Sequence, residues 1–127
     1  MKPISTPDAP AAIGPYSQAI RAGNTVYLSG QTPLVPETGQ MVEGDIEAQA
    51  RRCIENLEIA VRAAGGTLAN LVMVQIFLVD SADAAGMNAV YREFFTSQPY
   101  PVRATVVVKE LLAKGLRIEI TAQAVLD

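Results

Sequence analysis

The stretch between Asp45 and Ala64 constrains the fold most, because its apolar residues recur with the period of an α-helix. They are Ile46, Ala50, Cys53, Ile54, Leu57, Ala60, Val61 and Ala64. Charged residues lie mostly on the opposite side, so one face of this helix is predicted to pack against another layer. Asp45 is a suitable N-cap, and Gly65 with Gly66 provides a left-handed stop after the last turn.

The segments around this helix have the patterns of β-strands. Leu71–Val79 is almost wholly apolar, which predicts a central strand covered on both faces. A second helix is predicted over Asp83–Phe95, and the first 13 residues, rich in proline, are expected to form an irregular arm. The other predicted strands are Tyr16–Arg21 and Thr25–Gln31, joined by a turn at Ala22-Gly23-Asn24, and Val102–Glu110 and Leu116–Leu126, joined by a turn near Ala113-Lys114-Gly115.

This order predicts an α+β fold, with a single mixed β-sheet and two helices packed on one face. With 127 residues and no repeat or linker, we expect one domain spanning residues 1–127. Two helices cover only one face of the sheet, yet the strands carry apolar residues on both faces, including Phe77 and Val107 outside the set expected to face the core. We therefore expect sister subunits to cover the open face.

Composition excludes several classes of partner. Half of the residues are hydrophobic, but no apolar run approaches the roughly 20 residues that span a bilayer, so no membrane association is expected. The net charge is −3 and the ten basic residues are dispersed, which argues against nucleic-acid binding. The N-terminus lacks the apolar core of a signal peptide, and Cys53, the single cysteine, fits a buried thiol in the helix stripe. The expected location is the cytoplasm.

The absence of histidine removes the most common catalytic arrangements. A Ser-His-Asp triad, a Cys-His pair and a histidine-based zinc site are all excluded. No phosphate-binding loop and no carboxylate cluster suited to a metal is present, so no metal site is predicted. Chemistry must come from other polar side chains, from backbone groups and from water.

Arg103 is the first candidate, because it lies in a β-prone run rich in valine. Strand alternation places Arg103 and Thr105 on one face, and Glu119 lies on the corresponding face of the last strand. If these two strands pair as a hairpin, Arg103 and Glu119 share a sheet face. One interpretation is a solvated surface ion pair. The other is an anion site in a subunit interface, where the planar guanidinium would bind a carboxylate through two parallel hydrogen bonds.

Four further candidates have plain structural explanations as well. Tyr16, in Gly14-Pro15-Tyr16-Ser17-Gln18, fits a turn that enters an edge strand. Ser29 and Gly30 fit a strand end, and nothing in the sequence would activate Ser29 as a nucleophile. Asn88 fits a helix position that faces solvent.

Taken together, these motifs make the sequence resemble the RidA family (reactive intermediate deaminase A), also called the YjgF family. The most specific element is Pro101-Val102-Arg103-Ala104, followed later by Ile118-Glu119-Ile120-Thr121-Ala122. The other matching motifs are Ile13-Gly14-Pro15-Tyr16-Ser17-Gln18-Ala19, Leu28-Ser29-Gly30-Gln31, Gln49-Ala50 with Asn56-Leu57, and Asn88 with Tyr91 and Phe94-Phe95. The resemblance therefore runs over nearly the whole chain.

The resemblance implies a homotrimer of chorismate-mutase-like subunits with clefts between neighbours. It implies hydrolysis of reactive enamines and imines, such as 2-aminoacrylate and 2-iminopropionate, to 2-keto acids and ammonia, without a cofactor. By the same resemblance, Arg103 would clamp the substrate carboxylate and Glu119 would position or activate water. Tyr16, Ser29, Gly30, Asn88 and Thr105 would line the pocket.

Three positions depart from the family pattern. Thr105 stands where some members have cysteine, and Val107 replaces a common glutamate. The turn Leu112-Ala113-Lys114-Gly115 lacks the usual proline and is one residue longer, which could shift Glu119 relative to Arg103. Two alternative functions stay open: a non-catalytic binding module or metabolite sensor for keto acids and other carboxylates, and RNA cleavage that inhibits translation. The acidic composition and the lack of histidine argue against RNA cleavage.

Overall fold

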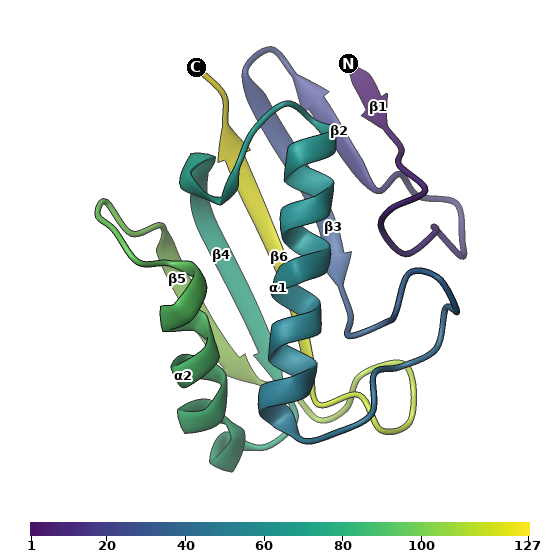
Figure 1. Cartoon of the computed structure of the whole chain (residues 1–127), viewed down its shortest axis with the longest axis vertical. Helices are drawn as coiled ribbons and strands as arrows, with labels where there is room; N and C mark the ends of the chain where they lie inside the picture. Colours follow the sequence, from purple (N-terminus) through teal and green to yellow (C-terminus); the bar gives the residue numbers. More distant parts are fainter.

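A computed structural model describes residues 1–127 as one six-stranded sheet with two helices on one face (Figure 1). The strand order is β1-β2-β3-β6-β4-β5, in which only β5 runs parallel to its neighbour. The predicted α+β class, with a single mixed sheet, is confirmed. The elements are β1 Lys2–Ile4, β2 Ala19–Ala22, β3 Thr25–Gln31, α1 Ile46–Ala63, η1 Leu68–Asn70, β4 Leu71–Leu78, η2 Ser81–Asp83, α2 Ala84–Phe94, β5 Val102–Val107 and β6 Ile118–Val125.

The long helix α1 has the ends that its sequence predicts. Asp45 accepts a hydrogen bond from the backbone amide of Ala48 at 3.0 Å, and Gly65 adopts a φ of 97° directly after the C-cap. All residues of the predicted stripe except the half-buried Ile46 are buried, and the helix packs on the core side of β3 and β6. Cys53 is buried, and burial raises the pKa of its thiol well above the usual value, so the thiol stays protonated.

The N-terminal arm is more ordered than its prolines suggest. Residues Lys2–Ile4 form the edge strand β1, which pairs with β2, so the prediction of a wholly irregular arm is wrong. Pro3 is compatible with this place because an edge strand leaves one row of backbone groups unpaired. The first half of the predicted strand Tyr16–Arg21 is irregular, since β2 begins only at Ala19.

The predicted hairpin between the last two strands does not form. β4, α2 and β5 make a crossover unit, so β5 returns parallel to β4 at the edge of the sheet. β6 then lies between β3 and β4 and runs antiparallel to both. β4 therefore separates β5 from β6. Because β6 is paired on both sides, its register is set by its two neighbours rather than by the turn that precedes it.

One face of the sheet lies uncovered in the single chain, as predicted. This open face carries half-buried Phe77 of β4, together with Val102 and Val106 of β5, which are exposed. Val107 was expected on this face, but it is opposite Leu78 in register and lies on the helix-covered face, where it is 53% exposed. No helix combines the length and apolar character needed to cross a membrane.

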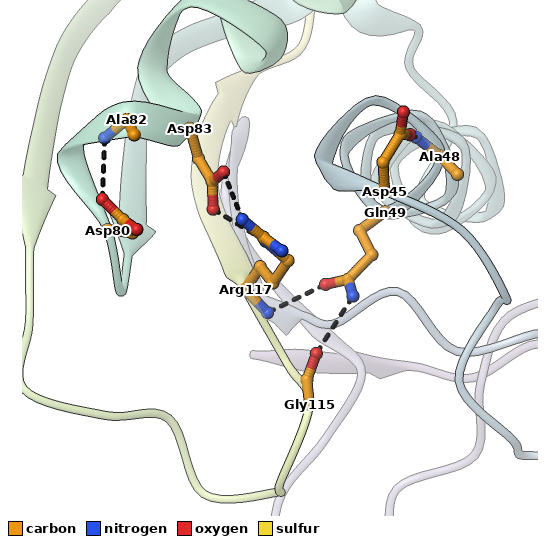
Figure 2. A network of polar contacts seen from close by, with 8 residues as sticks. All are labelled: Asp45, Ala48, Gln49, Asp80, Ala82, Asp83, Gly115 and Arg117. Atoms are coloured by element: carbon orange, nitrogen blue, oxygen red, sulfur yellow. Dashed lines mark hydrogen bonds and ion pairs between the residues drawn. The ribbon is translucent and has the colours of Figure 1, made fainter.

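A polar network ties the starts of both helices to the segment before β6 (Figure 2). Buried Asp83 accepts two hydrogen bonds from Arg117, at 2.9 Å from Nε and 2.6 Å from Nη2. Gln49 of α1 donates to the carbonyl of Gly115 at 3.0 Å and accepts from the backbone amide of Arg117 at 2.8 Å. These bonds hold the turn that leads into β6, where Gly115 has a φ of 91°.

Replacing Asp83 with alanine is expected to lower the melting temperature by roughly 5–10 °C, because the buried carboxylate and two hydrogen bonds are lost together. Asp80→Ala is the matched control, since it removes one exposed hydrogen bond to the amide of Ala82. Thermal unfolding of both variants, followed by circular dichroism, compares them. Equal losses for the two variants would show that the network does not hold the fold at this end.

Candidate functional site

Arg103 lies on the helix-covered side of β5, where α2 holds its guanidinium. Arg103 is opposite Val74 in register, and Val74 is fully buried on the core face. Nη1 of Arg103 donates to Oδ1 of Asn88 at 2.8 Å, and the guanidinium carbon lies 4.7 Å from the centroid of the Tyr91 ring. Asn88 and Tyr91 are one turn apart on α2, so a single helix face supplies both contacts. The guanidinium is thus exposed but oriented.

The support under Arg103 is an aromatic pair. Tyr91 stacks on Phe95 with ring centroids 4.2 Å apart and an interplanar angle of 19°. Burial raises the pKa of Tyr91, and the charge of Arg103 opposes that rise. The phenol therefore stays neutral and offers its ring face to the cation. Tyr91 was paired with Asn88 in a family motif but was not predicted as a site residue; its spacing of three from Asn88 is the signal that could have placed it beside Arg103.

Thr105 lies two residues along β5 on the same side as Arg103, opposite Ile76 in register, and is exposed. We call Asn88, Tyr91, Arg103 and Thr105 the arginine cluster. Three of its members were predicted as site residues, and the structure brings them to one edge of the sheet.

Glu119 lies on the open face, against the backbone of β3. It is opposite Phe77 in register. A Cβ on Gly30 would overlap Oε2 of Glu119 and would lie 3.1 Å from its Cδ, so only glycine leaves room for this carboxylate. The side chain is half-buried, and burial raises its pKa. A carboxylate with a raised pKa is a stronger base, which suits proton transfer from water.

Ser29 adjoins Gly30 in β3, and Tyr16 precedes Ser17, to which Ser29 is bonded; both are fixed by backbone contacts. Oγ of Ser29 donates to the carbonyl of Ser17 at 2.5 Å, and the amide of Ser29 donates to the carbonyl of Gln18 at 3.0 Å. Tyr16 is half-exposed, and its hydroxyl accepts from the amide of Ile13 at 3.3 Å. The hydroxyl hydrogen of Ser29 is thus already used in a hydrogen bond to the backbone. We call Tyr16, Ser29, Gly30 and Glu119 the glutamate cluster.

Gln18 is a positioning residue that the sequence interpretation missed. Its buried side chain accepts from the amide of Thr6 at 2.7 Å and donates to the carbonyls of Thr6 and Pro10 at 3.2 and 2.9 Å. These three bonds fix the N-terminal arm next to Tyr16. A glutamine beside a proline-rich arm is a weak signal in sequence, because such residues usually face water.

The arginine cluster and the glutamate cluster are far apart in one chain. Arg103 and Glu119 are two strands apart and offset by three positions along β4, about 10 Å in each direction, and they point to opposite faces. The predicted shared face is therefore wrong. The surface ion pair is also wrong, because the four ion pairs of the chain are Arg51–Glu93, Arg52–Glu55, Arg62–Glu58 and Arg117–Asp83.

The physical reason for this error is the edge position of β5. All of its residues are exposed, so the valines on its two faces do not reveal which side the helices cover. The contact of Arg103 with α2 shows which side of β5 the helices cover, and that contact depends on Asn88 and Tyr91. Within one chain Arg103 is therefore too distant to lower the pKa of Glu119, and burial raises that pKa.

A pocket with a volume of about 340 Å³ opens beside Arg103. Its walls are Tyr91, Arg92, Phe95, Tyr100, Pro101 and Arg103. No group of three or more His, Cys, Asp or Glu side chains is placed to hold a metal ion. The arrangement within one chain is thus an anchored cation beside a pocket and, on the other face, a partly buried base.

Replacing Gly30 with alanine is expected to lower kcat by about 10- to 100-fold, because the new methyl group displaces the Glu119 carboxylate. The melting temperature should change little, since the displaced atoms are the end of a flexible side chain. Steady-state kinetics with a suitable substrate and thermal unfolding measure the two effects. Gly23→Ala, at an open turn with a φ of 62°, is a control that should change stability and leave kcat intact.

Comparisons with known proteins extend over nearly the whole chain. The family model described as Endoribonuclease L-PSP matches residues 6–126. A RutC family protein of Sinorhizobium fredii is 47% identical over 122 residues, which cover 96% of this chain and 95% of the relative. The 2-iminobutanoate/2-iminopropanoate deaminase of Escherichia coli K12 is 44% identical over 126 residues, which cover 98% and 97%. The crystal structure of E. coli TdcF with bound serine matches with a TM-score of 0.94 and 40% identity, over all of both chains.

Proposed function

The chain belongs to the RidA (YjgF) family, and we propose that it hydrolyses reactive 2-imino acids and their enamine tautomers to 2-keto acids and ammonia. The observation that carries the proposal is the guanidinium of Arg103, oriented by Asn88 and Tyr91 beside an open pocket. Relatives of nearly the same length with 44–45% identity are named as 2-iminobutanoate/2-iminopropanoate deaminases.

Arg103 is proposed to bind the carboxylate of the substrate. Asn88 accepts from Nη1 only, so Nε and Nη2 remain free for two parallel hydrogen bonds to a carboxylate. This contact fixes the adjacent imine carbon relative to the attacking water, which lowers the entropic part of the barrier. Asn88 and Tyr91 set the plane of the guanidinium, and Thr105 is proposed to contact the substrate from the same side of β5.

Glu119 is proposed to accept a proton from the attacking water. Oxygen attacks the protonated imine carbon, and the carboxylate takes the released proton, which gives a carbinolamine. Return of that proton to nitrogen lets the carbon–nitrogen bond break, and the carbonyl forms as the hydroxyl loses its proton; the products are the keto acid and ammonium. The protonated imine is already electrophilic, so the reaction needs neither a histidine nor a strong nucleophile. Tyr16, Ser29 and Gly30 are proposed to line the wall around the water.

The two clusters are proposed to meet between neighbouring copies of the chain. They lie on opposite faces and some 10 Å apart in two directions, so one substrate cannot touch both within a single chain. A cyclic assembly brings different surfaces of two copies together, which would place Arg103 of one chain opposite Glu119 of the next. The family resemblance implies a homotrimer, and the uncovered face with Phe77 and Val106 is the surface we assign to that contact.

The test is a coupled assay in which an amino-acid oxidase or serine dehydratase generates the imine in the presence of the purified protein. Release of ammonia and keto acid should be faster than the spontaneous rate. A panel of amino acids with different side chains ranks the substrates. No acceleration with any imine would reject the proposal.

Binding without catalysis is a second candidate, favoured by the serine bound in E. coli TdcF. It predicts that keto acids raise the melting temperature while no imine is turned over. The description of the family model suggests ribonuclease activity as a third. A net charge of −3 and the lack of histidine argue against it, and incubation with RNA at low salt, followed by electrophoresis, decides the matter.

A further inference from the structure

The pocket beside Arg103 is lined by two arginines and by no acidic residue. Arg92 and Arg103 both line it, and the other walls are the uncharged residues Tyr91, Phe95, Tyr100 and Pro101. The chain as a whole has a net charge of −3, so the positive charge of this pocket is opposite in sign to the net charge of the chain. A concave surface with charges of one sign concentrates ligands of the opposite sign.

Neither arginine has an acidic partner. The four ion pairs of the chain involve Arg51, Arg52, Arg62 and Arg117 only. Glu93, which follows Arg92 in sequence, is bound by Arg51 through two contacts at 3.3 and 2.8 Å. Both charges in the pocket are therefore free to bind an anion.

The two arginines share the pocket with a stacked aromatic pair. Arg103 lies over the ring of Tyr91, which stacks on Phe95. Arg92 lies in the last turn of α2 and Phe95 is its C-cap, and both line the pocket. A volume of about 340 Å³ is at the small end of ligand sites and suits a short molecule.

Arg92 also has a simpler structural role. It lies in the last turn of α2, where a positive charge interacts favourably with the helix dipole. That role would contribute to stability alone. A purely stabilising role predicts that loss of Arg92 lowers the melting temperature and leaves the choice of ligand unchanged. A binding role predicts that the choice of ligand changes.

We infer that Arg92 binds a second anionic group of the substrate, which makes dicarboxylic 2-imino acids the preferred class. The carboxylate next to the imine binds Arg103, the short aliphatic stem crosses the pocket beside Tyr100 and Pro101, and the distal carboxylate reaches Arg92. This inference rests on the proposed function, because it names the substrate of the same site. The hydrolysis itself is unchanged.

The experiment compares two imines generated in the assay, 2-iminosuccinate from aspartate and 2-iminopropionate from alanine. The native protein should have a higher kcat/KM for 2-iminosuccinate. Arg92→Gln should lower that kcat/KM by about tenfold and leave the value for 2-iminopropionate within about twofold. Arg92→Lys should keep part of the preference. Arg62→Gln, which removes the same charge from an exposed site on α1, should have no effect on either.

The inference would be overturned if Arg92→Gln still preferred 2-iminosuccinate, or if the native protein showed no preference for it. In either case, turnover of 2-iminopropionate would still support the proposed function. If neither imine is hydrolysed, the proposed function fails, and binding then decides the inference. In that case 2-oxoglutarate should raise the melting temperature more than 2-oxobutanoate does, and Arg92→Gln should abolish the difference. Equal shifts in the native protein would reject the second anion site.

Discussion

Replacing Arg103 with alanine is expected to lower kcat/KM for 2-iminopropionate by at least about 100-fold, because two charge-assisted hydrogen bonds to the substrate carboxylate are lost. The fold should be unaffected, since Arg103 is exposed and forms no ion pair with an acidic side chain. Coupled kinetics, thermal unfolding and size-exclusion chromatography measure activity, stability and assembly separately.

Two further variants distinguish a positioned guanidinium from a simple positive charge. Arg103→Lys keeps the charge but loses the planar pair of donors, so it should recover only a small part of the activity. Asn88→Ala removes the bond that orients Nη1 and should raise KM by a few fold. Full activity in Arg103→Ala would reject the carboxylate clamp.

Replacing Glu119 with glutamine is expected to lower kcat by about 10²- to 10⁴-fold, the usual contribution of a general base. KM should change less, because Arg103 still binds the carboxylate. Glu110→Gln, at an exposed position outside both clusters, is the control for loss of one negative charge. A kcat that is unchanged in Glu119→Gln would remove Glu119 from the mechanism.

The pH dependence of kcat in the native protein also tests whether Glu119 is the base. Burial raises the pKa of Glu119, so the base is lost on acidification at a higher pH than for an ordinary glutamate. The raised pKa means that folding disfavours the charged form, and the resulting loss of stability appears as pH rises above the unfolded-state pKa. Glu119→Gln should therefore lose the acid limb of the rate profile and gain relative stability at neutral pH.

The core and the class of fold were predictable because local and global signals agree. The stripe of α1 is buried as expected. The apolar run of β4 lies inside the sheet as expected, but only its helix-facing side is covered within one chain, so the prediction of a strand covered on both faces is wrong for the single chain. The pairing of β5 was not predictable from alternation, because an exposed edge strand does not distinguish its two faces. The order of strands depends on the crossover through α2, which is a long-range property of the chain.

The candidate residues were predicted by motif, but their arrangement was not. Arg103, Asn88 and Thr105 meet at one edge of the sheet. Ser29, Gly30 and Glu119 meet near the end of β3, and Tyr16 is linked to them through its neighbour Ser17, which accepts from Ser29. The contact between Glu119 and Gly30 joins residues 89 positions apart through the pairing of β3 with β6. Tyr91 orients Arg103, and Gln18 holds the N-terminal arm at Thr6 and Pro10; these contacts exist only in the folded chain.

The most direct test of a site shared between copies is to mix two inactive variants. Arg103→Ala and Glu119→Gln are unfolded together in equal amounts, refolded and assayed for imine hydrolysis. In a ring with random mixing, a given site receives an intact Arg103 from one chain and an intact Glu119 from the next with a probability of about one quarter. The mixture should therefore regain about a quarter of native activity, while each variant refolded alone stays inactive. Mixed assemblies that form but remain inactive would contradict the account.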